Sequence, residues 1–297
     1  MRIFLCQDAV EDQSEWHHLD MVAYRISEGY HIWDAASAGI IEGSAWLQSL
    51  TNHLPNYLLL LQKAAAHALY STTLHSKRIT VTTKQHAHPL ALSPAHAAKL
   101  LNKPLTILVE NRFSDALFLK SVLQRLAPPE LIEYCQSQPE AIVCDSPGGR
   151  GELPKTIEDY ATNSMTNSIP IRLVVIVDNE GNTADHRDRI ANKIIDLCTK
   201  HNIPYHILKK RAIENYIPDK LWENHATTRE QADKEKINEF IKSDKTTHDF
   251  HDIKKQFGKK SVDLFAKYHQ HLTADNLRLR DGEGELDQIV AMIVKEV

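Results

Sequence analysis

Residues 172–180 read RLVVIVDNE, and this stretch decides the fold. The apolar run in Arg172–Val177 is typical of a strand buried on both faces, as the strands of a parallel sheet are. Asp178-Asn-Glu180 follows at once, so two carboxylates come directly after the predicted strand. The stretch therefore predicts a parallel α/β sheet with acidic side chains at the carboxyl end of one strand.

The sequence on either side repeats the pattern of a strand followed by a helix. Other strands are predicted at 105–109 (LTILV), 141–144 and 204–208. Helices are predicted between them, with Ser114 as the N-cap of the first and later starts near Pro154 and Thr183. Such alternation with right-handed crossovers gives a parallel sheet with flanking helices. We expect this α/β fold in residues 104–222.

Carboxylates follow two of these predicted strands. Glu110 comes directly after the first strand, and Asp178 and Glu180 come after the third. Functional groups of open α/β sheets gather at the carboxyl ends of the strands. If the two strands are neighbours, the carboxylates converge, and a hard cation such as Mg²⁺ or Mn²⁺ would relieve their repulsion. The alternative is that each acidic residue lies in a solvated turn or caps the next helix.

Four segments of this region together resemble the TOPRIM domain, and more narrowly the TOPRIM modules of OLD-type (overcoming lysogenization defect) nucleases and related bacterial anti-phage effectors. The segments are VENRFSDALFLKSVL (109–123), CDSPGGRGEL (144–153), VVIVDNEGN (174–182) and ILKKRAIENYIPD (207–219). The resemblance covers about residues 104–222. It implies a TOPRIM-like, Rossmann-like sheet and a metal-dependent nuclease that hydrolyses phosphodiester bonds of DNA or RNA in bacterial anti-phage defence.

The resemblance also assigns residues and partners. A Glu after the first strand and a D-x-D after the third bind divalent metal in this family, so the implied catalytic metal ligands are Glu110, Asp178 and Glu180. Asn111 stands where the family usually has Gly, and Glu180 fills the second acidic position. OLD-type nucleases often act with an ATPase module. Since this chain has no P-loop motif, a separate ATPase subunit is an expected partner.

A cationic triplet follows the fourth predicted strand. Lys209 and Lys210 are catalytic candidates that could hold the scissile phosphate, and Arg211 is a candidate for nucleic-acid binding. A solvated strand exit is the alternative. Glu214 is a further candidate carboxylate, although at a helix start it would also favour the helix dipole. The turn at 148–151 (GGRG) could let a phosphate backbone approach closely, although a tight connection between strand and helix is favoured.

Charge is unevenly divided along the chain. Residues 186–280 hold 20 basic against 14 acidic side chains, whereas residues 105–185 hold 6 against 12. A basic region beside an acidic one suits a nucleic-acid surface next to a metal site. The basic patch predicted to bind nucleic acid comprises Lys254, Lys255, Lys259 and Lys260. A solvated, charged helical face is the alternative.

The flanking regions are predicted to be separate units. Residues 1–103 are expected to form a small α+β recognition or assembly domain, with strands at 2–6, 21–26 and 79–82 and a helix over about 44–69. A proline-punctuated boundary is expected within 86–104, and residues 223–297 are expected to be helical. A domain of about 100 residues has little margin of stability, so we expect it to lean on the sheet or on a second subunit of a homo-oligomer.

Composition excludes several classes of protein. With 42% hydrophobic and 25% charged residues, the chain is globular and not disordered. The longest apolar stretch, 57–70, contains Gln62 and Lys63 and is too short to span a bilayer. No signal peptide or C-x-x-C motif is present, so we expect a cytoplasmic protein with reduced thiols, bound to no membrane.

Two other functions compete with the nuclease. The first is a catalytically inactive TOPRIM-fold module that binds nucleic acid or a partner protein. The second is a receiver-like signalling domain, which is disfavoured because no clear phosphoacceptor arrangement accompanies the D-x-E pair.

Overall fold

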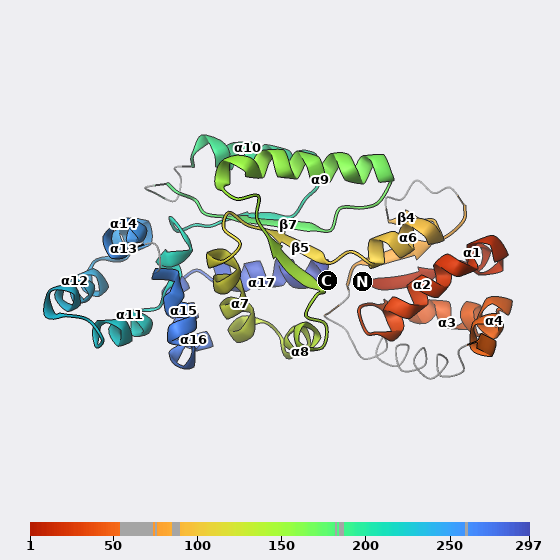
Figure 1. Cartoon of the computed structure of the whole chain (residues 1–297), viewed down its shortest axis with the longest axis horizontal. Helices are drawn as coiled ribbons and strands as arrows, with labels where there is room; N and C mark the ends of the chain where they lie inside the picture. Colours follow the sequence, from red (N-terminus) through yellow and green to blue (C-terminus); the bar gives the residue numbers. More distant parts are fainter. Residues whose placement is uncertain (54–73, 75, 85–89, 182, 184–186, 259–260) are drawn as a thin grey trace.

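The chain folds into two parallel four-stranded sheets with helices packed around them (Figure 1). A computed structural model describes residues 1–297 except 54–73, 75, 85–89, 182, 184–186 and 259–260. The α/β class predicted from the sequence is confirmed. The helix expected over 44–69 is present as α4 (Ala45–His53), and the rest of that prediction lies outside the described residues.

The second sheet contains the strands predicted from the sequence. They are β5 (Leu105–Leu108), β6 (Ile142–Asp145), β7 (Leu173–Val177) and β8 (Tyr205–Ile207), in the order β6-β5-β7-β8. β5 and β7 are central neighbours, with Thr106 opposite Leu173 and Leu108 opposite Val175. Because every pair is parallel, the carboxyl ends of all four strands lie at one edge of the sheet.

Helices cover both faces of this sheet. The helices between the strands are α7 (Ser114–Leu126), α8 (Pro129–Ser137), α9 (Leu153–Asn167) and α10 (Arg189–Lys200). α9 and α10 lie side by side over one face, where Val175 shares a core with Ile157 and Ile194 (Figure 1). On the other face, Val174 belongs to a core with residues of α7 and of the last helix. Burial on both faces explains the unbroken apolar runs of β5 and β7.

The start of α7 differs from the prediction. Ser114 is the first helical residue and not the N-cap. The side chain of Asn111 takes the capping role, because its Oδ1 accepts hydrogen bonds from the backbone N–H groups of Phe113 (2.9 Å) and Ser114 (3.2 Å). An amide oxygen placed before the helix can satisfy these otherwise unpaired donors.

The C-terminal region is helical, as predicted. It contains α11 (Asp219–Ala226), α12 (Gln231–Lys242), α13 (Lys245–Phe250), α14 (Ile253–Phe257), α15 (Leu264–Lys267), α16 (Ala274–Asp281) and α17 (Glu285–Glu296). Three aromatic rings, those of Trp222, Phe240 and Phe257, pack with centroids 5.0 to 5.5 Å apart. This packing is continuous with the core below the second sheet, so α11 to α17 are built onto the sheet.

The N-terminal region is an α/β unit, so the α+β prediction for it is wrong. Its sheet has the order β2-β1-β3-β4 and only parallel pairs. The strands are β1 (Arg2–Leu5), β2 (Ile32–Trp33), β3 (Arg78–Val81) and β4 (Ala91–Leu92). The helices are α1 (Gln7–Glu11), α2 (Trp16–Ser27), α3 (Ala38–Glu42), α4 and α6 (Pro94–Leu101). Strands of two residues, such as β2 and β4, leave no periodic signal in the sequence.

The strand predicted at 21–26 is part of helix α2. Leu19, Val22, Ala23 and Ile26 are buried at helical spacing. The apolar residues within 21–26 fit both a strand and a helix over so short a window, and the period becomes clear only when Leu19 is included.

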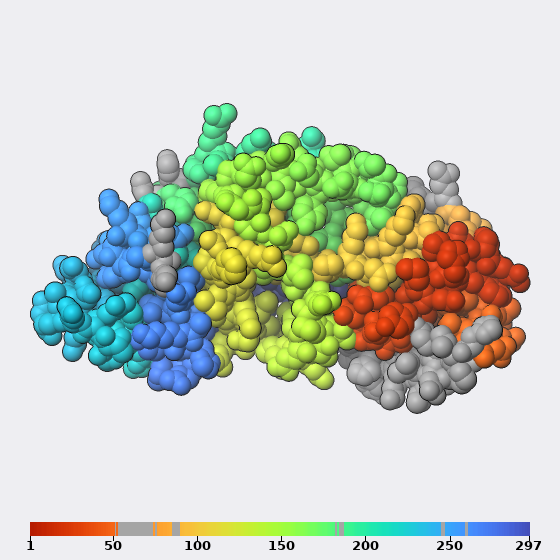
Figure 2. Space-filling view, in the orientation of Figure 1, coloured from red at the N-terminus to blue at the C-terminus, as the bar shows by residue number. Residues whose placement is uncertain are grey.

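Several polar contacts join the N-terminal unit to the rest of the chain, among them the ion pair of Lys77 with Glu296 and the hydrogen bond from Gln138 to the carbonyl of Glu28. The Tyr134 hydroxyl on α8 donates to the carbonyl of Tyr30 (3.0 Å), and Arg172 donates to the carbonyl of Lys103 (2.7 Å). Figure 2 shows the N-terminal unit at one end of the molecule and the helices α11 to α16 at the other, whereas α17 lies centrally beneath the second sheet (Figure 1). The boundary between the two units was predicted within 86–104. Since β4 and α6 belong to the N-terminal unit, the connection between the units consists of residues 102–104.

Short 3-10 helices complete the described structure. They are η1 (Gln13–Glu15), η2 (Ala35–Ser37), η3 (Arg150–Glu152), η4 (Ile213–Tyr216), η5 (Ser261–Asp263) and η6 (His269–His271). Within the described part of the chain, no helix combines the length and apolar character that a bilayer span requires.

Candidate metal centre

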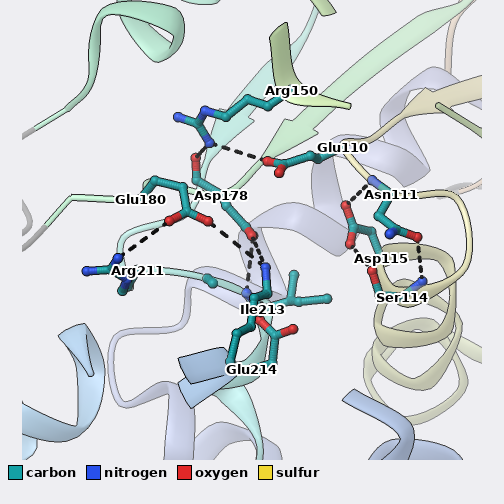
Figure 3. A network of polar contacts seen from close by, with 12 residues as sticks. Glu110, Asn111, Ser114, Asp115, Arg150, Asp178, Glu180, Arg211, Ile213 and Glu214 are labelled. Carbon is teal, nitrogen blue, oxygen red and sulfur yellow. Dashed lines mark hydrogen bonds and ion pairs between the residues drawn. The ribbon is translucent and has the colours of Figure 1, made fainter. Parts of the chain in front are cut away.

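Three carboxylates meet at the carboxyl edge of the second sheet. Glu110 leaves β5, and Asp178 and Glu180 leave the neighbouring β7. One oxygen from each of the three lies within 4.8 Å of the others (Figure 3). The chain order of the strands reverses between β5 and β7, and such a switch point is where open α/β sheets bind ligands. The convergence predicted from the sequence is confirmed.

The two residues of the D-x-E pair reach the site in different ways. Asp178 is 3% exposed, and its Oδ1 accepts a hydrogen bond from the backbone N–H of Ile213 (3.1 Å). Glu180 has a φ of 55°, a left-handed conformation that non-glycine residues seldom adopt. Its backbone N–H donates to the carbonyl of Arg211 (2.8 Å). The chain therefore turns after β7. This turn, and not a continuation of the extended strand, directs the Glu180 side chain to the site.

Burial makes negative charge costly here. Desolvation raises the pKa of Asp178 well above its usual range, with an opposing contribution from Lys254. Desolvation also raises the pKa of Glu110, and Arg150 and Lys254 offset only part of that shift. The charge of Glu110 further raises the pKa of Asp178, and the charge of Glu180 further raises the pKa of Glu110, because like charges repel. The site therefore favours a bound cation, which would compensate for both desolvation and repulsion.

The geometry fits a small divalent cation. An octahedral Mg²⁺ holds oxygens at about 2.1 Å, which places neighbouring ligand oxygens roughly 3 to 4 Å apart. The observed spacing of up to 4.8 Å is close to this range, so small side-chain rotations would complete the site. Oε2 of Glu110 is buried without a hydrogen-bond partner among the described residues and has the Arg150 guanidinium 3.5 Å away, so this oxygen suits the role of a metal ligand.

Arg150 is a site residue that the sequence reasoning missed. It lies in the turn at 148–151, where Gly148 has a φ of 91°. Its guanidinium donates to the carbonyl of Asp178 (2.6 Å) and to Oδ1 of Asp188 (2.8 Å), and it lies 3.5 Å from Oε2 of Glu110. The turn, for which a tight connection was the favoured prediction, thus brings a nearly buried cation between the two central strand ends. The sequence feature that could have indicated this role is a single Arg that follows a pair of glycines.

Lys254 lies inside the site and not on an outer basic patch. Its Nζ is 3.4 Å from Asp178, 3.5 Å from Glu214 and 4.0 Å from Glu180. Burial alone would lower the pKa of the ammonium, but these carboxylates outweigh it and raise that pKa. Lys254 thus acts as an internal counter-ion of the acidic cluster.

The segment at 213–216 holds Lys254 in place. The Asn215 side chain donates to the carbonyls of His248 (2.9 Å) and His251 (3.1 Å), which flank the connection from α13 to α14. The Arg211 N–H donates to the carbonyl of Asp249 (3.0 Å). The buried polar residues that follow β8 thus position the helix that carries Lys254.

Two more carboxylates border the triad. Glu214, considered a candidate in the sequence, is 1% exposed, and burial raises its pKa. Asp115 was missed. It accepts from the Asn111 backbone (2.9 Å) and the Ser114 hydroxyl (2.8 Å), and burial raises its pKa as well. An acidic residue in the first turn of a helix is common, so its sequence position gave no reason to select it.

The cations predicted after β8 are dispersed. Lys209 forms an ion pair with Glu283 (2.9 Å), and the buried ammonium of Lys210 bonds to Asp249. Arg211 approaches the triad, with its guanidinium 3.8 Å from Glu180. Lys255 is exposed next to the site, and Lys259 and Lys260 lie outside the described residues.

Fold and site together define a parallel α/β protein with a candidate divalent-metal centre at the carboxyl ends of its central strands. No protein-family model matches the chain, and no curated protein or solved structure is significantly similar to it. Function is therefore inferred from these residues and their geometry.

Proposed function

We propose that the protein is a metal-dependent nuclease of the cytoplasm that hydrolyses phosphodiester bonds of DNA or RNA with Mg²⁺ or Mn²⁺, in bacterial anti-phage defence. The observation that carries this proposal is the convergence of Glu110, Asp178 and Glu180 within 4.8 Å at the switch point of the sheet. The resemblance of residues 104–222 to TOPRIM modules supports the same activity.

Each residue of the site has a role in this proposal. The three carboxylates would hold the cation, which supplies an activated water and charge neutralisation at the phosphate. Arg150 orients the end of β7 through the Asp178 carbonyl and stands beside Glu110. Lys254 and Arg211 are the cations nearest the open side of the cluster, with side chains 38% and 21% exposed. They would contact the non-bridging oxygens of the scissile phosphate.

The test is metal-dependent cleavage of single- and double-stranded DNA and RNA by the purified chain. Wild type should cut at least one of these substrates with Mn²⁺ or Mg²⁺ and none with excess chelator. Glu110→Gln should reduce cleavage by at least about a hundredfold, since it removes a ligand charge while keeping the side-chain shape. Glu130→Gln, at an exposed position on α8, should leave cleavage unchanged. Equal activity of Glu110→Gln and wild type would contradict the proposal.

The alternative function is a binding module that no longer cuts. Lys254 favours it, because its ammonium already supplies positive charge to Asp178, Glu180 and Glu214 without a metal. Calorimetry with Mn²⁺ distinguishes the two. A nuclease should bind Mn²⁺ through the triad and lose that binding in Asp178→Asn. A protein that binds nucleic acid equally well with chelator, and binds no Mn²⁺, would be the inactive module.

A further inference from the structure

We propose that Phe113 is a stacking platform for an unpaired nucleobase beside the phosphate held at the metal centre. The substrate of the nuclease is accordingly single-stranded DNA or RNA, or an unpaired end or loop. This inference rests on the proposed nuclease function and adds the class of substrate to it.

Phe113 is exposed to a degree that packing does not explain. Its side chain is 86% exposed, the highest value among the large apolar residues that the structure describes. A phenylalanine placed in water forfeits the burial that normally favours this residue. The nearby residues Phe118, Leu119 and Val122 of α7 are all buried in the core, so the helix itself does not need Phe113 for packing.

The backbone under Phe113 is held firmly. Its N–H donates to Oδ1 of Asn111 (2.9 Å), and the Asn111 N–H donates to Oδ2 of Asp115 (2.9 Å). Asp115 also accepts from the Ser114 hydroxyl (2.8 Å). These bonds link the residues on both sides of the ring to the start of α7. An exposed ring on a fixed backbone loses little conformational freedom when a ligand stacks on it.

Phe113 lies on the short segment that joins the metal ligand Glu110 to α7. Phe113 follows the ligand Glu110 by three residues, and Asp115, two residues further on in the first turn of α7, interacts electrostatically with Asp178 (Figure 3). In this proposal, a base attached to a phosphate at the triad reaches the ring. Every base has a π face, so stacking on an aromatic side chain tolerates any sequence, but it requires a base that is free of its own helix.

A groove that includes Arg112, the neighbour of Phe113, suits the rest of a nucleic-acid strand. A groove of about 710 Å³ runs between α7, α8 and β6. Arg112 and Lys120 are the charged side chains among the described residues that line it. The remainder of the lining is apolar or uncharged, so no carboxylate of the lining would repel a phosphate backbone that leaves Phe113 in this direction.

Stacking can be measured directly with short single-stranded oligonucleotides that contain 2-aminopurine, whose fluorescence is quenched when the base stacks. Binding is followed in Ca²⁺, which takes oxygen ligands as Mg²⁺ does. Phe113→Ala should weaken binding by about 5- to 150-fold, the loss that removal of one base–aromatic stack produces, and should abolish the quenching. Phe113→Trp should retain both. Phe113→Leu, which keeps apolar surface without a π face, should behave like Phe113→Ala.

Met165→Ala is the matched control. Met165 is 66% exposed near the end of α9, at the opposite edge of the sheet from the triad, and its removal should change nothing. Mn²⁺ affinity should be the same in wild type and Phe113→Ala, so the metal centre is assessed separately from the platform. In cleavage assays Phe113→Ala should raise KM for single strands and leave kcat unchanged.

Three results would overturn the inference while leaving the nuclease intact. They are equal single-strand binding by Phe113→Ala and wild type, full retention by Phe113→Leu, and a change of oligomeric state in Phe113→Ala seen by light scattering, which would assign the ring to self-association. If wild type neither binds Mn²⁺ nor cuts any substrate, the proposed function itself has failed.

Discussion

At the scale of single residues, the cost of burying Asp178 leads to a testable trade between stability and function. Its folded-state pKa is raised, so in the metal-free protein the folded state retains a proton that the unfolded state has lost. The stability associated with the protonated group is present below the unfolded pKa of about 3.9 and is lost as pH rises through the folded pKa. At neutral pH the metal-free site therefore weakens the fold.

We expect Asp178→Asn to stabilise the metal-free protein and to abolish metal binding. The amide can still accept the hydrogen bond from Ile213 through Oδ1, but it carries no charge. The melting temperature in chelator should rise by about 2–4 °C, the shift that roughly 1 kcal/mol gives in a large domain. Added Mn²⁺ should stabilise wild type and not the variant. Asp159→Asn, at an exposed position on α9, is the control. A lower melting temperature for Asp178→Asn in chelator would contradict this account.

At the scale of secondary-structure elements, α14 determines which cation the carboxylates meet. Lys254 points into the cluster, whereas its neighbour Lys255 is exposed. We expect Lys254→Gln to raise the affinity for Mn²⁺ because it removes a competing positive charge. The same change should lower the melting temperature in chelator, since three carboxylates lose their counter-ion. It should also reduce cleavage if Lys254 contacts the phosphate.

Lys255→Gln is the matched control for Lys254→Gln, because it removes the same charge one residue away on the same helix. It should leave Mn²⁺ affinity and stability in chelator unchanged. If the two variants shift Mn²⁺ affinity equally, the effect reflects the general field of the basic region and not a counter-ion in the site.

Elements with a strong periodic signal could be predicted from the sequence, and elements stabilised by tertiary contacts could not. The strands β5 and β7, which are buried on both faces, could be predicted from their largely apolar sequences. The approach of Glu110 to Asp178 could be predicted with them. β2 and β4, of two residues each, exist only through pairing with β1 and β3. Lys254 was assigned to an outer patch because no local pattern shows that Asn215 fixes the path of the chain from α13 to α14.

The site residues show the same division. A strand end is a sequence feature, so the triad was predictable by the rule for parallel sheets. The position of Arg150 depends on a glycine turn, and that of Asp115 depends on hydrogen bonds at the start of α7. Neither arrangement is visible in the spacing of residues along the sequence. The conformation of Glu180, with a φ of 55°, has no counterpart in the residue pattern either.

At the scale of the whole molecule, the two sheets are joined by a short connection. Residues 102 and 103 are exposed between α6 and β5. Limited proteolysis should therefore cut first within 102–104 among the described residues, since exposed connections are preferred sites of cleavage. Lys103 provides a site for trypsin. The product 104–297 should remain folded and bind Mn²⁺, because the triad and its supporting helices all lie within it.

Two outcomes would contradict that expectation. The first is a chain that resists trypsin at Lys103 while being cut elsewhere in the described residues. The second is a fragment that aggregates on separation, which would show that the contacts between the two units, such as those of Tyr134 with Tyr30 and of Lys77 with Glu296, are essential to folding.

The position of α14 has a consequence for the newborn chain. The ribosome synthesises Glu180 well before Lys254. At roughly 5–20 residues per second, the acidic cluster is without the Lys254 ammonium for several seconds. Glu285, which accepts from the Lys209 N–H (2.7 Å) and so ties α17 to the exit of β8, emerges later still. During synthesis the cluster therefore lacks both its counter-ion and the helix that closes the core beneath it. The proposed nuclease would in this way stay incomplete until α14 and α17 have both been synthesised.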